Sequence, residues 1–434
     1  MATTTETETQ PPVESEYGVL LDTFGNRFEV PQYTIKEFRD AIPPECFKRS
    51  TLRGMSYVAR DLALLACTFY VFNIFVQPEY IPYQFLRFIL WNVYGFLNGL
   101  FGTGIWVLAH ECGHQAFSPS KLVNDTVGFV LHSALLVPYF SWKISHGKHH
   151  KSTAHMERDM VFVPRDRKEF ADKLKINIFQ LSEATEDAPL RTLLYVIGRQ
   201  IVGWPIYLLT NDTGHDVHNT SGEKRRRQKQ NGLFTGVSHF NPESPIFSPH
   251  EFKLIVLSDL GLILAGLALY TIGNRYGWAN LAVWYFLPYL WVNHWLVGIT
   301  YLQHTDPSLP HYYGSAWTFT RGAAATVDRD FGFIGRHLLH GIMETHVLHH
   351  YVSTIPFYNA DQATEAIKGV MGRHYQSAKI EGLFDFVRTI YRNVRSCEWV
   401  EQSSGAQGEG KDIVFFRNRN GLGVKPLNLH FKTE

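Results

Sequence analysis

The chain has 434 residues, of which 45% are hydrophobic, and it carries a formal net charge of +1 at pH 7. A chain of this length has room for about two or three soluble domains, but its apolar residues are gathered in long runs. The near-neutral charge argues against a nucleic-acid partner, since such proteins present strongly basic surfaces. The composition therefore favours an integral membrane protein.

The N-terminal segment is polar and rich in Thr, Glu and Pro. Residues 1–16 lack the basic region and apolar core of a cleavable signal peptide, so the first apolar helix is expected to direct membrane insertion. We expect residues 1–32 to form a disordered tail, residues 33–395 a membrane domain, and residues 396–434 a cytosolic C-terminal tail. The Ser-, Gly- and Gln-rich stretch 401–411 is also expected to be disordered.

Four apolar runs come close to the roughly 20 residues that a helix needs to cross a bilayer core. They are residues 62–76, 85–108, 252–272 and 281–302. Two weaker runs, 127–140 and 193–209, contain Pro or embedded polar residues, and we expect them to lie in the interface or to re-enter the membrane without crossing it. The sequence thus predicts an all-α integral membrane protein with about four transmembrane helices.

Basic residues are distributed unequally between the two sides of this predicted membrane domain. The loops 77–84 and 273–278 contain only Arg275. The other side carries Lys48, Arg49, Arg53, Lys143, Lys148, Lys151, Arg165, Arg167, Lys168 and the basic run 224–227. By the positive-inside rule, the basic side faces the cytosol. Disulfides are not expected there or in the membrane, where the four cysteines lie.

Three tight clusters of histidine lie on the predicted cytosolic side. Their members are His110, His114, His146, His149, His150, His346, His349 and His350. Steps of three and four residues place imidazoles on one face of a helix, so each cluster can act as one set of ligands. Imidazole suits iron, zinc, copper and nickel, and eight nitrogens exceed the ligands of one tetrahedral zinc. The clusters predict a site for two metal ions.

Seven other histidines lie in polar or loop-like stretches, and we expect them at the surface. They are His155, His215, His218, His239, His250, His311 and His374.

Three kinds of protein are compatible with the clusters. The HECGH sequence at 110–114 fits the HExxH pattern of zinc proteases, with Glu111 as the general base, but leaves the other clusters without a role. A zinc transporter or other metal-handling protein is a second alternative, although transporters place their ligands near the bilayer midplane. An all-nitrogen pair of irons at the membrane face suits oxygen activation next to acyl chains. From the residues alone, we favour a membrane lipid oxidase or desaturase.

Longer motifs surround these histidines. They include AIPPECFKRS at 41–50, HECGHQAFS from His110, LLVPYFSWKISHGKHH from Leu135, ERDMVFVP from Glu157, GWPIYLLTN from Gly203, ITYLQHTDPSLPHY from Ile299, ATVDRDFG from Ala325 and THVLHHYVSTIPFYNA from Thr345. Through these motifs, residues 33–374 resemble the membrane-bound fatty acid desaturases, specifically the plant and fungal delta-12 (oleate) type of the endoplasmic reticulum. The resemblance implies a desaturase domain over 33–395 and a histidine-rich diiron cap on the cytosolic face.

The resemblance implies a ninth ligand, His304, at the cytosolic end of the fourth helix. Related acyl-CoA desaturases have an asparagine one turn earlier, where this chain has Thr300. The nine histidines would then be both the metal ligands and the catalytic residues. Asp159, Asp328 and Asp330 are expected either to accept the free imidazole N–H of ligating histidines or to form surface ion pairs. Glu111, His132 and His340 are expected to support or pack around the site.

The resemblance further implies two iron ions, with electrons from cytochrome b5 and its NADH-dependent reductase. No HPGG haem motif or GxGxxG fingerprint occurs in the chain, which agrees with a separate electron donor. The favoured reaction is the oxygen-dependent conversion of oleate to linoleate. Omega-3, bifunctional delta-12/omega-3, hydroxylase and acetylenase activities stay open because these branches share one ligand set. The acyl carrier, the tunnel residues and the oligomeric state are not indicated by the sequence.

Overall fold

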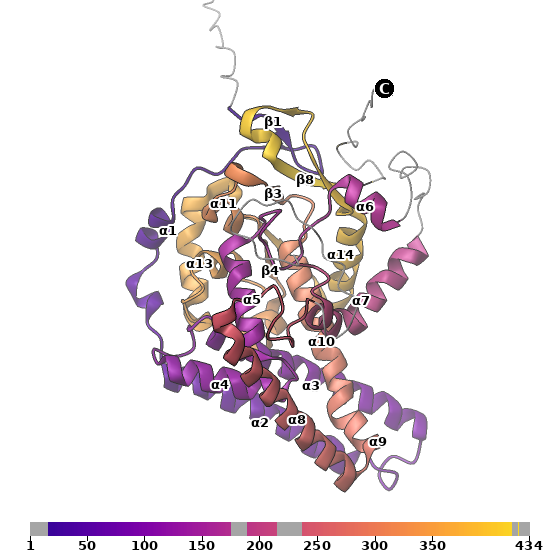
Figure 1. Ribbon diagram of the computed structural model, residues 1–434. Helices are drawn as coiled ribbons and strands as arrows, with labels where there is room; N and C mark the ends of the chain where they lie inside the picture. The colour runs from indigo at the N-terminus through magenta and orange to yellow at the C-terminus, as the bar shows by residue number, and fades with distance from the viewer. Residues whose placement is uncertain (1–15, 175–188, 215–236, 419–423, 425–434) are drawn as a thin grey trace, which may run out of the picture.

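In a computed structural model, the described residues 16–174, 189–214, 237–418 and 424 form a mainly helical protein (Figure 1). Long helices extend from one end of the molecule, and the strands β1 and β8 lie at the opposite end. The all-α class therefore describes most of the fold. The eight strands seen among the described residues, each of two to five residues, were not expected.

The elements follow one another along the chain in a simple order. The helices are α1 (Ile35–Ala41), α2 (Thr51–Phe75), α3 (Gln84–Gly113), α4 (Lys121–Ala134), α5 (Tyr139–Ser152), α6 (Arg167–Leu174), α7 (Pro189–Thr210), α8 (Phe252–Tyr276), α9 (Trp278–Leu281), α10 (Leu287–His304), α11 (Phe319–Ala324), α12 (His346–Tyr351), α13 (Phe357–Met371) and α14 (Gly382–Ser396). The strands are β1 (Gly18–Leu21), β2 (Arg27–Phe28), β3 (Pro310–Tyr312), β4 (Asp328–Asp330), β5 (Ser377–Lys379), β6 (Trp399–Gln402), β7 (Gly405–Ala406) and β8 (Ile413–Arg417).

Helix α3 is the central element of the long-helix bundle, because it packs against α2, α4 and α10. Its glycines make the close approach of α10 possible. A Cβ atom at Gly95 would lie 2.6 Å from Leu287, and one at Gly99 would lie 2.2 Å from Trp291. Small residues at helix contacts are typical of membrane bundles. The C-terminal half of α3 is almost wholly buried and ends in the first histidine cluster.

All four runs predicted to span the membrane are helical. The first is longer than predicted, since α2 begins at Thr51, and the fourth comprises α9, the π-helical turn η4 (Ala282–Phe286) and α10. The outer face of α8 is apolar and exposed, with exposed fractions of 59% for Ile263 and 57% for Leu267. A long exposed apolar face of this kind suits lipid rather than water.

Three described helical segments are long and apolar enough to cross a membrane: α2, α7 and Pro249–Tyr276. The bent pair α4 and α5 adds a fourth if it counts as one broken span, its two helices meeting at 109°. Helices α3 and α10 contain Asn, Trp and Tyr residues that lower their mean hydropathy. Three or four candidate spans agree with a membrane protein, whereas the identity of the crossing helices stays a prediction.

The two weaker apolar runs differ from each other in structure. Run 127–140 is divided by a bend in which Leu136 has a φ of 55° and Pro138 precedes α5. That break agrees with a segment that does not continue straight through the membrane. Run 193–209 lies within the single helix α7, which includes Pro205.

The two ends of the described chain pair with each other, contrary to the expected disorder. Strand β1 pairs with β2 and with β7, so that Gly18 lies opposite Ala406. Strand β8 pairs with both β3 and β6. Parts of 16–32 and 401–411 are therefore ordered, because β1 and β7, which are distant in sequence, form backbone hydrogen bonds with each other. Residues 1–15 lie outside the described residues.

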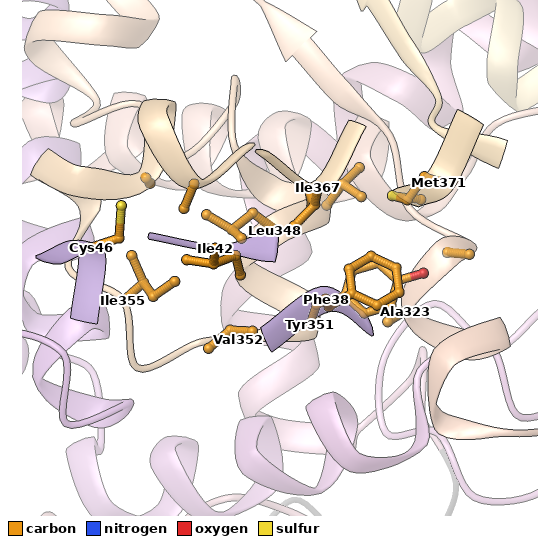
Figure 2. Close-up of a cluster of buried hydrophobic side chains, with 14 residues drawn as sticks. Phe38, Ile42, Cys46, Ala323, Leu348, Tyr351, Val352, Ile355, Ile367 and Met371 are labelled. Atoms are coloured by element: carbon orange, nitrogen blue, oxygen red, sulfur yellow. The ribbon is translucent and has the colours of Figure 1, made fainter. Parts of the chain in front are cut away.

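A buried hydrophobic cluster fixes the position of α12, the helix of the third histidine cluster (Figure 2). Phe38 of α1 stacks on Tyr351 of α12 with ring centroids 3.9 Å apart. Ile42 and Leu348 lie in the same cluster, together with Ile367 of α13. The short helix α12 thus packs between α1 and α13. This packing compensates for the low intrinsic stability of a six-residue helix.

Candidate metal centre

Four helices bring the nine predicted site histidines together. Helix α3 carries His110 and His114, α5 carries His146, His149 and His150, α10 ends at His304, and α12 carries His346, His349 and His350. Within α3 and α5 the four-residue steps place rings side by side, as the spacing predicts: His110 and His114 have ring centroids 4.6 Å apart. The convergence of the three clusters depends on long-range packing that the spacing alone does not specify.

The first group of ring nitrogens comprises His110, His114, His146, His150 and His349. One nitrogen from each lies within 4.8 Å of every other, which is close enough to surround one metal ion. The Nε2 atom of His110 lies 3.0 Å from that of His146 and 3.1 Å from that of His349. Five converging imidazoles fit a transition-metal ion that accepts nitrogen ligands.

The second group comprises His149, His304 and His350, with one nitrogen of each within the same limit. His346 joins it through His304, their Nε2 atoms being 3.0 Å apart. The Nε2 atom of His350 is buried and has no hydrogen-bond partner among the described residues. A buried nitrogen without a partner is costly, so this group too fits a metal ion. The two groups are compatible with the two metal ions that the sequence predicts.

The rings of His110, His114, His346 and His349 are neutral at ordinary pH. Burial, followed by the charge of neighbouring histidines, holds the pKa of His110, His114 and His346 well below its usual range. The same causes lower the pKa of His349 to about 3. A neutral imidazole keeps a lone pair on one ring nitrogen, which is the form that binds metal.

Asp159 holds one of these rings in place. Its Oδ1 atom lies 2.6 Å from Nδ1 of His149, and its carboxylate also accepts hydrogen bonds from the backbone N–H groups of Ala154 and Met160. The carboxylate therefore accepts a hydrogen bond from the Nδ1–H group of His149. The lone pair on Nε2 then points toward the second group of ring nitrogens. Of the two alternatives for Asp159, the structure supports the contact with a histidine.

We expect Asp159→Asn to reduce the metal affinity of the purified protein by roughly 10- to 100-fold, because an outer partner of a ligating imidazole is weakened. Metal retained after graded chelator treatment would be measured by elemental analysis. Asp172→Asn is the control, since Asp172 is exposed on α6. Equal metal retention in both variants would contradict this role for Asp159.

The other acidic residues act differently. Asp328 accepts the backbone N–H of Val347 at 2.8 Å and the hydroxyl of Tyr375 at 2.5 Å, so it fixes the start of α12 instead of an imidazole. Burial raises the pKa of Asp328 to about 7. Asp330 forms a surface ion pair with Arg336 at 3.6 Å.

Glu111 accepts the backbone N–H of Phe357 at 3.0 Å, and burial raises its pKa to about 8. Its other oxygen lies 3.9 Å from Nδ1 of His110, on the ring nitrogen opposite the converging Nε2 atoms. This supports a structural role for Glu111 and weakens its assignment as a protease base.

His132 and His340 lie outside both groups, as predicted. His132 is fully buried beside Trp106 and Trp142, with its Nε2 atom 3.3 Å from the backbone oxygen of Trp106. Nε2 of His340 lies 2.7 Å from the carboxylate of Asp61 in α2. That contact ties the segment before the third cluster to a long helix.

Three histidines predicted at the surface are instead buried: His155, His239 and His311. Nε2 of His239 lies 3.0 Å from the hydroxyl of Ser145, next to the second cluster. His311 lies in β3, which β8 covers. The surface prediction was wrong because these residues are covered by segments far away in sequence. His250 and His374 are exposed or partly exposed, and His215 and His218 lie outside the described residues.

A cavity adjoins the two groups of histidines. Five histidines line one part of it: His110, His146, His149, His304 and His346. Much of the remaining wall is apolar or aromatic and comes from α3, α7, α10 and α14, including Trp106, Trp204, Leu296 and Val297. Thr300 also lines the cavity, but its hydroxyl donates to the backbone oxygen of Leu296 at 2.8 Å. An apolar cavity that ends on metal ligands suits a long hydrocarbon chain.

Comparison with known proteins gives a family model and several relatives. The model described as fatty acid desaturase matches residues 87–379. The chain is 57% identical to an oleate hydroxylase of Claviceps purpurea over 416 residues, covering 96% of this chain and 87% of that protein. It is 42% identical to a delta(12) fatty acid desaturase of Mortierella alpina over 401 residues, covering 91% and 93%. A delta(12)-fatty-acid desaturase of Arabidopsis thaliana is 39% identical over 396 residues, covering 90% and 93%.

Proposed function

Since the chain belongs to the fatty acid desaturase family, we propose that it converts oleate to linoleate by inserting a cis double bond at the delta-12 (omega-6) position. The observation that carries this proposal is the convergence of histidines from four helices beside one apolar cavity. The identity to delta(12) desaturases over nine-tenths of the chain supports the same substrate. Membership of this family sets aside the zinc protease and the metal transporter.

The histidine cluster of a desaturase is an iron site, and we assign two iron ions to it. The group around His110 would hold one ion, and His149, His304, His346 and His350 would hold the other. Imidazole nitrogen is a suitable ligand for non-haem iron. When bound, iron would activate dioxygen, which supplies the oxidising power that removes hydrogen from an unactivated methylene group.

The protein's own residues contribute position and exclusion of water. Asp159 fixes the His149 ring, and Asp328 fixes the first turn of α12. Trp106 and Trp204 line the cavity next to the ligands and would exclude water from around the acyl chain. Holding the reacting carbons at one place in this cavity decides where the double bond forms. In the overall reaction, two hydrogens of the acyl chain, one O2, two electrons and two protons give the double bond and two waters.

We assign the histidine side of the protein to the cytosol and the protein to the endoplasmic reticulum membrane, with the membrane domain over 33–395. The electrons would come from cytochrome b5 and its NADH-dependent reductase. Basic residues on the histidine side support this orientation. Two of these residues already form ion pairs, Lys143 with Asp125 at 2.5 Å and Lys148 with Glu251 at 3.6 Å. An acidic partner would therefore have to bind elsewhere on this side or compete with those pairs.

Oleate hydroxylation is the second candidate, and one observation favours it: the 57% identity to the Claviceps hydroxylase over 96% of the chain. The two reactions require the same oxygen, electrons and protons. In hydroxylation, one oxygen atom enters the C–H bond and the other leaves as water. The ligand set is therefore compatible with both products.

Expression in a yeast that makes oleate but no polyunsaturated fatty acid is expected to produce linoleate, with the new bond six carbons from the methyl end. Gas chromatography with mass spectrometry of derivatised lipids would locate the bond. Cells that express the His350→Ala variant serve as the control, because that variant lacks a ligand. Hydroxy-oleate as the main product would assign the chain to hydroxylation, and linolenate formed only from added linoleate would assign it to the omega-3 branch. An unchanged lipid profile with inserted, iron-loaded protein would overturn acyl chemistry.

A further inference from the structure

Helix α7 has two functional faces. Tyr195, Arg199 and Gly203, spaced four residues apart, line the cavity that leads to the histidines. The opposite face is apolar and exposed, with exposed fractions of 67% for Leu190 and 49% for Ile201. The helix thus separates the cavity from an outer surface that suits lipid.

The wall of the cavity reaches the protein surface on α7, the helix against which α14 packs. Tyr195 lines the cavity and is nevertheless 49% exposed, so its ring lies at the mouth. Helix α14 packs against α7 and contributes Ile390 and Val394 to the same wall. The two helices lie side by side on one flank of the molecule (Figure 1). A chain that enters here would pass directly from the lipid-facing surface into the cavity.

The mouth carries a fixed positive group in a largely apolar wall. The Arg199 guanidinium forms an ion pair with Asp212 and donates from Nε to the hydroxyl of Tyr195 at 3.2 Å. Its side chain is 24% exposed, so it remains accessible. Arg165 and Lys173 lie close enough to act electrostatically on the Asp212 carboxylate. A guanidinium has five N–H donors, and the two contacts named here leave donors for a ligand.

We propose that Arg199 binds a phosphate group of the acyl carrier at the mouth of the cavity, so that the acyl chain enters from a fixed starting point. Guanidinium matches phosphate oxygens in geometry and charge, and its contacts to Asp212 and Tyr195 hold it in position before the ligand arrives. Two carriers offer this chemistry: the phosphodiester of a glycerophospholipid and the phosphates of coenzyme A. The inference rests on the proposed acyl-chain chemistry, and it names the residue that recognises the polar end of the substrate.

The test compares three oleoyl carriers with the iron-loaded, full-length protein in nanodiscs, supplied with cytochrome b5, its reductase and NADH. The carriers are oleoyl phosphatidylcholine, oleoyl-coenzyme A and monooleoylglycerol, which has no phosphate. For Arg199→Gln, we expect KM to rise roughly 10- to 100-fold on one phosphate carrier, the loss typical of a hydrogen bond between charged groups, with kcat within about twofold. The phosphate carrier that shows the rise identifies the source, and KM for monooleoylglycerol should not change.

Arg191→Gln is the matched control, since Arg191 is an exposed arginine of the same helix outside the cavity wall. Arg199→Lys keeps the charge without the fork of donors, and it should raise KM less than Arg199→Gln. If the Gln variant loses iron, the Lys variant alone decides, and a wild-type KM on both phosphate carriers would overturn the proposal. An equal rise in KM on all three carriers would also overturn it. If the wild-type protein turned over no carrier, the proposed function itself would fail.

Discussion

A His349→Ala variant is expected to form no detectable linoleate or hydroxy-oleate in yeast and to lose at least one iron when purified. His349 belongs to the group of five nitrogens, is 6% exposed, and has its Nε2 atom 3.1 Å from that of His110. Its removal leaves a gap that the neighbouring rings, fixed on separate helices, cannot close. Iron per chain would be measured by elemental analysis, and product by gas chromatography.

His337→Ala is the matched control, because His337 is an exposed histidine nine residues before the third cluster and belongs to neither metal group. It should retain both iron and activity. Membrane insertion of both variants would be checked by carbonate extraction. Full activity of inserted His349→Ala would remove this residue from the ligand set.

Arg329→Met is expected to destabilise the protein by on the order of 3–5 kcal/mol, the cost typical of leaving one partner of a buried ion pair unpaired. Arg329 is 2% exposed, donates from Nη2 to Asp306 at 2.6 Å, and donates from Nε to the backbone oxygen of Leu302 at 3.1 Å. The substitution leaves the Asp306 carboxylate without its ion-pair partner. Asp306 lies just after the end of α10, two residues from His304. Thermal unfolding of detergent-solubilised protein would report the loss as a lower Tm.

Arg373→Met provides the comparison, since Arg373 pairs with Glu29 at 2.6 Å but its side chain is 70% exposed. An exposed pair of this kind is worth about 1 kcal/mol or less. Similar Tm values for the two variants would show that the Arg329–Asp306 pair adds nothing beyond a surface contact.

Local patterns in the sequence predict the features that depend on neighbours along the chain. The three histidine clusters and the helical runs are of this kind, because helix periodicity fixes which side chains share a face. His304 stands alone in sequence, and only the family resemblance indicates it. In the structure, the Nε2 atom of His304 lies 3.3 Å from the Nε2 atom of His149.

Features that depend on distant partners could not be predicted. The stretch 401–411 has the composition of a disordered linker, yet Gly405 pairs with Val19 in a short sheet. His239 looks like a loop histidine, yet it is buried against Ser145. Arg199 lies within an apolar run, where it reads as a break in hydrophobicity. Its position in the cavity wall, beside Asp212, is what suggests the phosphate-binding role proposed above.

The pairing of the two chain ends also constrains the order of events during biosynthesis. Gly18 cannot find its partner Ala406 until nearly the whole chain has left the ribosome, which takes roughly 20–80 s at about 5–20 residues per second. Strand β3 likewise cannot pair until β8 has been synthesised. The long helices therefore enter the bilayer well before the cap around the histidines can close. The nine predicted ligands, the last of which is His350, are all synthesised before Ala406, so every ligand-bearing helix is made before the two chain ends can pair.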